Sequence, residues 1–403
     1  MIEVIEYKPK KQTNQFLKNK SHSLQFLPQS LLQISRVKYV EFKEKKLKTS
    51  YLIDIVHNLL LKYYFKKENR FNLSATILKE KYGYLYNYYI DFLLNQESIY
   101  LVQKHRAGKN ARVYKLNESI INGTITRYRN TDRVLLKKWN NAISNIESSD
   151  VEKNSILPEV KRKLIEDLYH IQIDYEKSIF FLDSTMQKSD IYNKNKYSVD
   201  AISEKHIFYH FDAYGRMHTN FTILKSFIRK NCLLIEGDEV CELDIKNSQP
   251  LFLTKLMLDE GLPEINLDEF ELFKELTISG QFYQYLIENS QLKNKQEAKD
   301  LVYKVLFGKN YKNKSDLIFK GLFPTVYNFI KIYKSKAKDY RKLSHRLQKD
   351  ESNLIFNKII KNIMYIWPEV KIITVHDSII FQRKYKSLVE EIFNNKLKQE
   401  FDI

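Results

Sequence analysis

Two short apolar segments, far apart in the chain and joined by helix-forming sequence, most constrain what this chain can fold into. Residues 239–245 and 370–381 are each bounded by turn residues, which is typical of short buried strands. Gly (9) and Pro (7) are scarce among the 403 residues, which favours a helix-rich chain with few long loops. Strands interleaved with helices from about residue 206 onward therefore predict an α+β domain.

The charge balance indicates an anionic partner. Lys plus Arg number 67 against 49 for Asp plus Glu, a formal net charge of +18. An excess of this size is common in nucleic-acid-binding proteins, although a solvated basic surface with no specific partner has the same composition. The hydrophobic fraction of 43% excludes a disordered chain.

The cysteines and the apolar runs indicate the compartment. Cys232 and Cys241 are too few for a disulfide framework, and no Cys/His spacing predicts a zinc site. The first residues lack the basic-then-apolar pattern of a signal peptide. No apolar run approaches the roughly 20 residues of a membrane span. We therefore expect a reducing, cytoplasmic setting and no membrane partner.

Three regions precede the α+β domain. Residues 1–50 are basic and irregular, and predict an N-terminal arm or cap. Residues 51–118 predict three helices followed by two strands, with Ser74 as an N-cap and a basic turn that carries Lys104 and His105. This order resembles a winged helix, and a small helical module of another kind fits equally well. The expected helices are 51–64, one from Ser74, and 84–94; the strands are 98–102 and 111–116; the turn also holds Arg106, Gly108 and Lys109.

The third region, residues 119–205, is charged and predicts mostly helix. Its clearest amphipathic stretches are 134–146 and 160–175, and Leu157-Pro158 is a helix entry signal.

Two acidic residues close the apolar segments. Asp244 ends the run Val240-Cys241-Glu242-Leu243-Asp244, and Asp377 ends Ile372-Ile373-Thr374-Val375-His376-Asp377. A carboxylate at the end of an apolar strand is costly to desolvate unless a positive group meets it. Two such carboxylates on adjacent strands can hold two magnesium ions, the arrangement that activates a 3′-hydroxyl and neutralises a triphosphate. For either Asp considered alone, a role in capping a turn is a better interpretation than a role as a metal ligand.

A helix between the two acidic residues has a more specific pattern. Lys295, Lys299, Tyr303 and Phe307 recur every four residues, and Gly308 follows. This spacing aligns the side chains along one helix face with a slow drift. The cations can contact a triphosphate and the rings can pack on a base and sugar. An amphipathic core helix with solvated lysines gives the same pattern.

The order of these elements resembles motifs A, B and C of family A nucleic-acid polymerases, which include DNA polymerases and the phage-type single-subunit RNA polymerases. Tyr214-Gly215-Arg216 followed by Arg229 resembles the segment that introduces the palm, and Leu347-Gln348 resembles the Gln-bearing segment before motif C. The resemblance covers roughly the last 200 residues. It implies a right-hand polymerase: a palm at 206–403 with a small antiparallel sheet, helical fingers inserted at about 255–335, and a helical thumb-like region at 119–205.

The resemblance also implies a role for each matching residue. Asp244 and Asp377, with the carbonyl of Ile245, are the ligands of two Mg²⁺ ions, for which Mn²⁺ is a substitute. Lys299 is catalytic and contacts the triphosphate. The other implied nucleotide contacts are Lys295, Tyr303, Phe307 and Gln249; the implied primer and template contacts are Arg216, Arg229, Gln348 and His376.

Departures from the family pattern leave open whether the expected substrate is a deoxyribonucleotide or a ribonucleotide. Gln249 stands where the DNA polymerases have a Glu that excludes ribose, and Ser378 follows His376-Asp377 as in the RNA polymerases. Phe307 stands where both branches more often have Tyr. Proofreading is not expected, because the Asp-x-Glu triplet at Asp150 lies in a polar stretch and not on a strand.

The sequence thus favours a compact template-dependent polymerase or primase-like enzyme of a phage or mobile element, acting on a primed template with nucleoside triphosphates. The order and spacing of the helix motif favour DNA synthesis slightly over RNA synthesis. A DNA-binding replication initiator with an inactive palm is the alternative from another class, and template-independent terminal transfer is a third.

Overall fold

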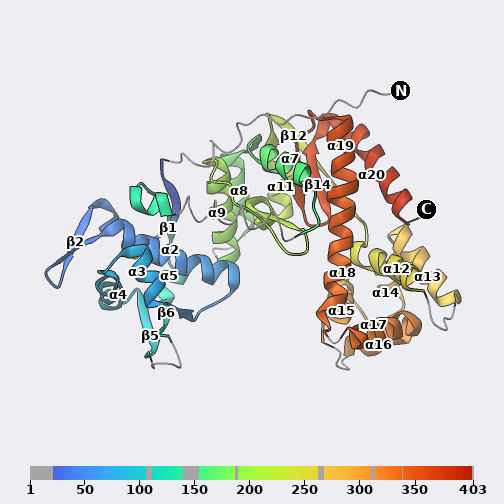
Figure 1. Ribbon diagram of the computed structural model, residues 1–403, viewed down its shortest axis with the longest axis horizontal. Coiled ribbons are helices and arrows are strands. Elements are labelled where there is room, and N and C mark those ends of the chain that lie inside the picture. The colour runs from blue at the N-terminus through green and yellow to red at the C-terminus, as the bar shows by residue number, and fades with distance from the viewer. Residues whose placement is uncertain are drawn as a thin grey trace. The chain divides into compact units, whose positions relative to one another are not determined.

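A computed structural model describes residues 21–105, 111–138, 154–186, 189–261, 267–309, 314–337 and 339–401. This part of the chain is α+β and rich in helix, with small antiparallel sheets, as expected (Figure 1). It divides into two compact units. The first holds residues 1–149, 171–208 and 219–234, and the second holds residues 150–170, 209–218 and 235–403.

The first unit is built around helix α2 (Thr49–Lys66), whose Leu52, Val56, Leu60 and Tyr64 are buried. Their four-residue spacing gives one apolar face, which packs in the unit's core. Strand β1 (Ser23–Pro28) pairs antiparallel with β7 (Ile125–Asn130). Strand β8 (Ile171–Ile173) pairs with β11 (Leu233–Ile235). The other elements are η1 (Gln29–Leu31), η2 (Ile34–Arg36), β2 (Tyr39–Phe42), β3 (Lys45–Lys48), α5 (Glu118–Asn122), α8 (Tyr175–Thr185), α9 (Asp190–Ser203), α10 (Asn220–Ile223) and α11 (Ser226–Cys232).

Within this unit, the segment after α2 has the expected order of elements. It runs through β4 (Phe71–Asn72), α3 (Ala75–Tyr82), α4 (Tyr86–Asn95), β5 (Ile99–Gln103) and β6 (Val113–Leu116), and the sheet order is β4-β6-β5. Ser74 is the N-cap residue of α3. Arg106, Gly108 and Lys109 lie outside the described residues.

Two local predictions were wrong. Most of residues 23–48 form strands β1, β2 and β3 and the short 3-10 helices η1 and η2, so the described part of the N-terminal region is not irregular. The helix expected over 160–175 ends at Leu168, and Ile171–Ile173 forms a strand instead. Ile171 and Ile173 are β-branched and flank a single polar residue, which is a strand pattern. It is too short to outweigh the longer helical periodicity of residues 160–175, so the sequence predicted a helix there. Of the stretch 134–146, only residues up to 138 are described, and these are helical.

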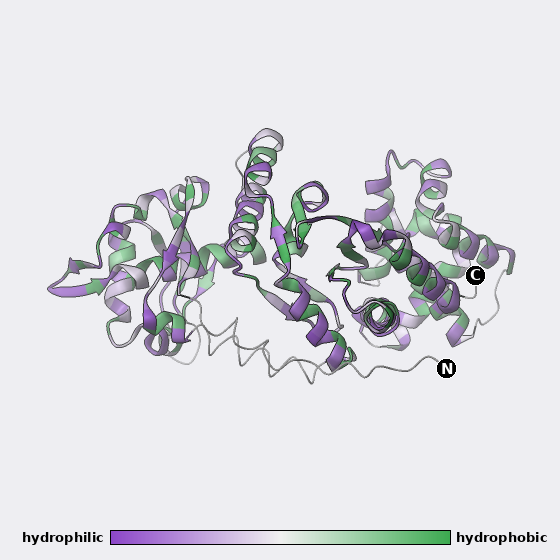
Figure 2. Cartoon of the chain, turned by 90° about the horizontal axis from the view of Figure 1, so that it is seen from above, coloured by the Kyte–Doolittle hydropathy of each residue, from purple (hydrophilic) through white to green (hydrophobic). Residues whose placement is uncertain are grey.

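The second unit contains the two predicted apolar segments. The first forms one strand as expected, but residues 370–381 form two strands separated by a turn at His376 and Asp377. The strand order is β13-β14-β12, all antiparallel, from β12 (Asp238–Asp244), β13 (Ile372–Val375) and β14 (Ser378–Gln382). Every residue of β13 and β14 is buried, which explains their nearly continuous apolar sequence. Strands β9 (Tyr209–Phe211) and β10 (Met217–Thr219) pair separately. Along the helices, Figure 2 shows hydrophobic and hydrophilic residues alternating, as helices with one buried face require.

The helices of the second unit are α7 (Pro158–Leu168), α12 (Ser248–Glu260), α13 (Leu267–Ser279), α14 (Phe282–Glu288), α15 (Lys295–Phe307), α16 (Lys314–Leu322), α17 (Pro324–Lys336), α18 (Arg341–Ser352), α19 (Lys361–Ile366) and α20 (Lys386–Phe401). A π-helical segment, η3 (Asn353–Ile360), joins α18 to α19 without a break, so the three form one long helix (Figure 1). Its Asn357 accepts a hydrogen bond from Leu157 N at 3.0 Å and thereby caps the start of α7.

A buried ion pair connects α7 to β13. Lys163 Nζ lies 2.6 Å from both carboxylate oxygens of Asp167 and donates to Val370 O at 2.8 Å, while Asp167 accepts from Ile372 N at 2.9 Å. Burial lowers the pKa of Lys163 and raises the pKa of Asp167, and their mutual attraction opposes both shifts. Each charge is therefore tolerable in the interior only while its partner is present.

We expect Asp167→Ala to lower the free energy of unfolding by about 3–5 kcal/mol, because it strands the Lys163 charge in the interior. Urea denaturation measures the loss. The double variant Lys163→Met/Asp167→Ala removes the stranded charge, so it should lose less stability than the sum of the two single variants. A double variant that loses the full sum would contradict the account.

Candidate active site

The two acidic residues of the apolar strands lie at one end of the β12–β14 pair. Asp244 is the last residue of β12 and lies opposite Ser378, the first residue of β14, so Asp377 is next to this pair. Ile245 N donates to Asp377 O at 3.4 Å. His376 has a left-handed φ of 56°, which lets the chain turn tightly from β13 into β14. The antiparallel register thus brings together two residues that are far apart in sequence.

Burial and like charges act together at this strand end. Burial, followed by the negative charges of Glu351 and Asp244, raises the pKa of Asp377 to about 7. A half-buried carboxyl in this state must either hold a proton or have a cation nearby. Two carboxylates plus the backbone oxygens of the turn are the oxygen ligands that Mg²⁺ prefers. The residues present therefore fit a magnesium site formed by Asp244, Asp377 and the Ile245 carbonyl.

The Tyr214-Gly215-Arg216 segment forms the tight turn between β9 and β10. Asp212 Oδ1 accepts from Tyr214 N and from Arg216 N, each at 2.9 Å. Gly215 has φ +87°, and a Cβ there would lie 3.2 Å from Ser352 Cβ, so both the backbone conformation and the close approach to α18 require glycine. The turn directs the Arg216 side chain toward α18, where it meets Glu351.

Glu351 is the most heavily bonded side chain of the site. Its Oε1 accepts from Arg216 Nε at 3.1 Å and from Arg216 Nη2 at 2.5 Å. Its Oε2 accepts from Ser248 Oγ at 2.5 Å and from Gln249 Nε2 at 2.6 Å. The carboxylate is only 1% exposed. One buried charge therefore connects the β9–β10 turn, the start of α12 and the end of α18.

Helix α15 has the bounds that the four-residue pattern predicts, from Lys295 to Phe307. The rings of Tyr303 and Phe307 stack with centroids 5.3 Å apart and planes 20° apart. Lys299 Nζ lies 5.9 Å from the ring centroid of Tyr283 on α14. Lys295 is exposed at the first turn of the helix, where Asn294 caps the N-terminus by accepting from Glu297 N.

The exposed face of α15 is close to the acidic residues. Burial raises the pKa of Tyr303, and the charges of Asp377 and Glu351 add to the shift. Burial likewise raises the pKa of Tyr283, with further contributions from Tyr303 and Asp377. The two rings are therefore within electrostatic range of the predicted metal ligands; Tyr283 lies on α14, and Tyr303 lies on α15, which also carries Lys299.

A buried lysine determines where α15 ends. Lys334 Nζ donates to Val305 O at 2.6 Å and to Gly308 O at 2.9 Å, which satisfies carbonyls that the helix end leaves unpaired. Burial, with help from the nearby Lys331 charge, lowers the pKa of Lys334 to about 8. Because Lys334 lies on α17, these bonds attach α17 to the C-terminal end of α15.

The remaining predicted residues are less closely connected to this cluster. Gln348 is half-buried on α18, one turn before Glu351. The His376 ring lies 6.4 Å from that of His218, which bonds Asp212 at 2.9 Å. Arg229 lies in α11 of the first unit, where Nη1 donates to Leu224 O at 2.5 Å; its contact with primer or template stays a prediction.

The sequence reading gave no role to Glu351, Ser248 or Tyr283. A Glu within a charged helix usually lies in solvent, so the charge pattern of the helix gives no reason to single out Glu351. The sequence does contain a signal that Glu351 is buried. Five of the eight residues 353–360, which come shortly after it, are apolar and buried, so the helix changes from solvated to buried near Glu351.

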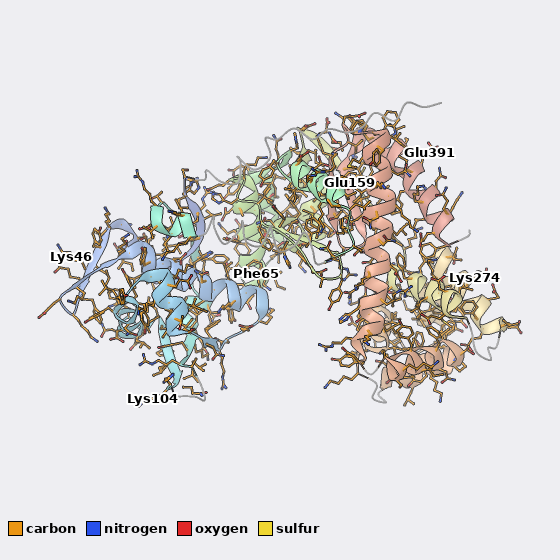
Figure 3. The ribbon with its side chains drawn as sticks, in the orientation of Figure 1. Lys46, Phe65, Lys104, Glu159, Lys274 and Glu391 are labelled. Atoms are coloured by element: carbon orange, nitrogen blue, oxygen red, sulfur yellow. The ribbon has the colours of Figure 1, made fainter. Side chains whose placement is uncertain are left out.

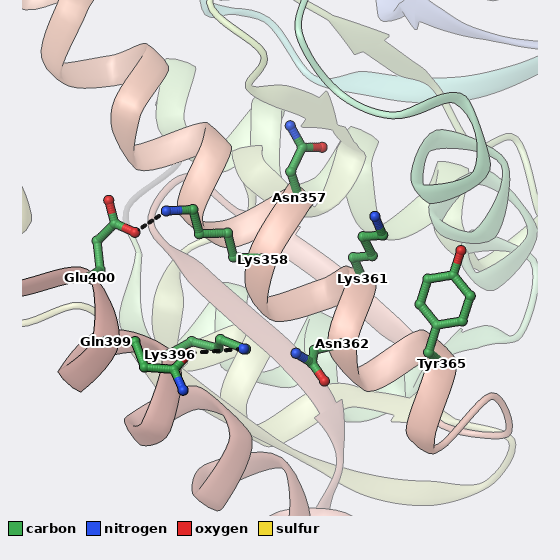
Figure 4. Close-up of a pocket in the computed structure, with 8 residues that line it drawn as sticks. All are labelled: Asn357, Lys358, Lys361, Asn362, Tyr365, Lys396, Gln399 and Glu400. Atoms are coloured by element: carbon green, nitrogen blue, oxygen red, sulfur yellow. Dashed lines mark hydrogen bonds and ion pairs between the residues drawn. The ribbon is translucent and has the colours of Figure 1, made fainter. Parts of the chain in front are cut away.

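A hollow of about 380 Å³ lies away from this cluster (Figure 4). It is lined by side chains of η3, α19 and α20, including Lys358, Lys361 and Lys396. Glu400 pairs with Lys358 and lies 3.8 Å from Lys255, and Lys396 bonds the neutral Gln399 at 2.9 Å, so the lining carries three lysines and one carboxylate.

No protein-family model matches the chain, and no curated protein sequence matches it. Within the described ranges, none of the helices combines the length and the apolar character needed to cross a membrane.

We expect Glu351→Ala to lower the free energy of unfolding by about 3 kcal/mol, because Arg216 loses its buried counter-charge and two further donors lose their acceptor. Glu351→Gln, which keeps the shape, should cost about 1–2 kcal/mol. The matched control is Asp350→Ala, since Asp350 pairs with the half-exposed Arg346 at 2.8 Å and should contribute no more than about 1 kcal/mol. Urea unfolding ranks the three. Equal losses for Glu351→Ala and Asp350→Ala would contradict a central role for Glu351.

Proposed function

We propose that the chain is a template-dependent nucleotidyltransferase, a compact DNA polymerase that uses two magnesium ions and lacks a proofreading nuclease. One observation carries the proposal: Asp244 and Asp377 are brought to one strand end, beside the Tyr303 and Lys299 face of α15. There burial, together with the charges of Glu351 and Asp244, raises the pKa of Asp377 to about 7. Crowded carboxylates next to a cationic and aromatic helix face are what transfer of a nucleotide to a 3′-hydroxyl needs.

Each group has a defined task in this proposal. Magnesium, when bound, supplies activation of the 3′-hydroxyl and neutralisation of the leaving group. Asp244, Asp377 and the Ile245 carbonyl position it. Lys299 contacts the triphosphate and is close enough to the Tyr283 ring to be oriented by it. The stacked Tyr303 and Phe307 offer a flat apolar surface for the base and sugar of the incoming nucleotide.

The primer and template contacts follow from the same geometry. Arg216 has five N–H donors, and its bonds to Glu351 use the Nε and one Nη2 donor, so the guanidinium keeps donors for a nucleic acid while its position is held. His376, which precedes Asp377, supplies a further polar group at the strand end, and Gln348 supplies one on α18.

The sugar of the nucleotide distinguishes this proposal from the phage-type RNA polymerase reading. Gln249 is buried and donates to Glu351, at the position where a DNA polymerase of the resembling family has its ribose-excluding Glu. The order and spacing of α15 favour DNA synthesis, and the nucleotide test below includes both sugars for this reason.

We expect Asp244→Asn and Asp377→Asn each to lower magnesium-dependent primer extension by on the order of 10²–10³-fold or more, because each removes a charge that holds the metal. The assay uses a primed DNA template with either dNTPs or NTPs, beside a bare single strand to detect template-independent transfer. Asp238→Asn is the matched control: it begins the same strand β12 and forms only a surface pair with Lys384.

Extension that survives in either Asp244→Asn or Asp377→Asn would overturn the metal assignment. No extension by the unaltered chain with either sugar, together with tight DNA binding, would favour a DNA-binding protein with an inactive palm.

That second candidate function rests on a separate observation in the first unit. The order α2, β4, α3, α4, β5, β6 with sheet order β4-β6-β5 is the order expected for a winged helix, a class of DNA-binding domain. Strand β5 is exposed from Tyr100 onward, and Lys104 lies beyond its end (Figure 3). Arg112, also exposed, precedes β6. We propose that this hairpin contacts the phosphates of duplex DNA, either to position a template for the polymerase or as the main activity of an initiator.

We expect Lys104→Ala and Arg112→Ala each to reduce the slope of log Kd against log salt for duplex DNA by about 1, because each removes one phosphate contact. Fluorescence anisotropy at several salt concentrations measures the slope. Lys274→Ala is the control, since Lys274 pairs with Glu271 at 3.3 Å on α13. Slopes unchanged by both hairpin variants would exclude the hairpin from DNA binding.

A further inference from the structure

Three potential metal ligands converge in the first unit, outside the candidate active site. His22 directly precedes β1, Glu204 is the C-cap residue of α9, and His206 follows two residues later. His22 Nε2 lies 2.9 Å from Glu204 Oε2 and 3.2 Å from His206 Nε2. One ligand atom from each residue lies within 4.8 Å of the others, and all three side chains are half-buried.

These separations suit a tetrahedral ion. Zinc binds imidazole nitrogen at about 2.0–2.1 Å, so neighbouring ligand atoms on a tetrahedral zinc are about 3.3 Å apart. The His22–His206 separation is close to this value, the His22–Glu204 separation is shorter, and the third separation, between Glu204 and His206, is within 4.8 Å. In the absence of an ion, a single proton on His22 Nε2 faces both Glu204 Oε2 and His206 Nε2, and one N–H bonds only one of them well.

The surrounding contacts support the orientation that a metal ligand needs. With an ion on Nε2, the ring proton of His22 resides on Nδ1, which lies 3.1 Å from Ser21 Oγ and can donate to it. Arg129 Nη2 donates to Glu204 Oε1 at 2.9 Å and so holds the carboxylate from its far side. Burial opposes ionisation of Glu204, but the bonds from Arg129 and His22 outweigh it and lower the pKa to about 2, so the ligand is a carboxylate at neutral pH.

Arg127 and Arg129 limit the affinity of this site for a metal ion. Arg127 Nη1 lies 3.3 Å from Glu204 Oε1, and Arg129 Nε lies 3.1 Å from Glu204 Oε2, the atom that would contact the ion. Asp200 offsets part of this charge, at 3.6 Å from Arg127. Positive charge next to a divalent ion weakens its binding, so we expect an affinity well below that of an all-thiolate structural site.

We propose that His22, Glu204 and His206 form a zinc-binding site that fastens the start of β1 to the end of α9. Two imidazoles and one carboxylate favour zinc or a similar transition metal over magnesium, which prefers oxygen ligands. The site joins elements that already touch: Tyr197 of α9 donates to Leu24 O at 3.3 Å, and its ring lies 4.4 Å from that of Phe26. Three protein ligands leave the fourth position for water. This site is independent of the proposed polymerase chemistry.

Zinc titration of the untagged, metal-stripped full chain tests the proposal by calorimetry. We expect one zinc per chain, with no comparable binding of magnesium at this site. His22→Gln and Glu204→Gln should each weaken zinc binding by on the order of 10-fold or more. Zinc at about a hundred times its Kd should raise Tm by about 2–4 °C, and the variants should lose this increase.

The matched control is His170→Gln. His170 Nδ1 lies 2.8 Å from Glu236 Oε1, a His–Glu pair of similar separation, and the described residues supply no third ligand there. It should leave zinc binding unchanged. A variant that failed to fold would not decide the matter, so cobalt(II) is added to the unaltered chain as well: visible absorption typical of tetrahedral cobalt supports the site. No zinc binding, equal loss in His170→Gln, or an octahedral cobalt spectrum would each overturn it.

Discussion

The second unit depends most on one buried carboxylate, that of Glu351. Four donor groups from the β9–β10 turn and the start of α12 meet it, and it is carried by the end of α18. A buried charge is destabilising unless its hydrogen bonds are satisfied. The four hydrogen bonds to Glu351 therefore favour one arrangement of these three elements. A Cβ built on Gly215 would lie 3.2 Å from Ser352 Cβ and the residue has φ +87°, so this turn beside α18 favours glycine.

The same charge acts on the chemistry proposed for the site. Glu351 adds to the negative potential at Asp377, and Arg216 partly offsets it. The site is therefore arranged with more negative charge than its own cations neutralise, which favours a bound divalent ion. The hydrogen bonds to Glu351 position three elements, and its charge contributes to the electrostatic potential at Asp377. These two roles explain why polar groups lie in the interior here in place of apolar ones.

Buried cations solve a related problem elsewhere in the second unit. Lys334 satisfies the carbonyls at the end of α15, and Lys163 satisfies the carbonyl of Val370 before β13. Both lysines have a lowered pKa, because burial opposes their charge. Lys334 acts at the end of α15, where Phe307 lies, and Lys163 acts at the start of β13, the strand that leads to Asp377. Positional accuracy at the site is thus obtained with charges that are expensive to bury.

Local sequence was sufficient for features set by short-range periodicity. It predicted α2, α3, α4, β5 and β6, the strands that carry Asp244 and Asp377, and α15 with its bounds, because helix spacing, capping residues and apolar runs act within a few residues. It failed at β8, where three residues are too few to establish a period.

Tertiary structure alone decided which distant residues meet. The pairing of Asp244 with Ser378 follows from antiparallel register, the bonds of Glu351 follow from the packing of α12, α18 and the β9–β10 turn, and the convergence of His22 with Glu204 and His206 joins opposite ends of the first unit's sequence. No spacing in the chain encodes these contacts. They arise because burying the apolar faces of strands and helices leaves few ways to pack them, and the polar groups carried along must then find partners where that packing places them.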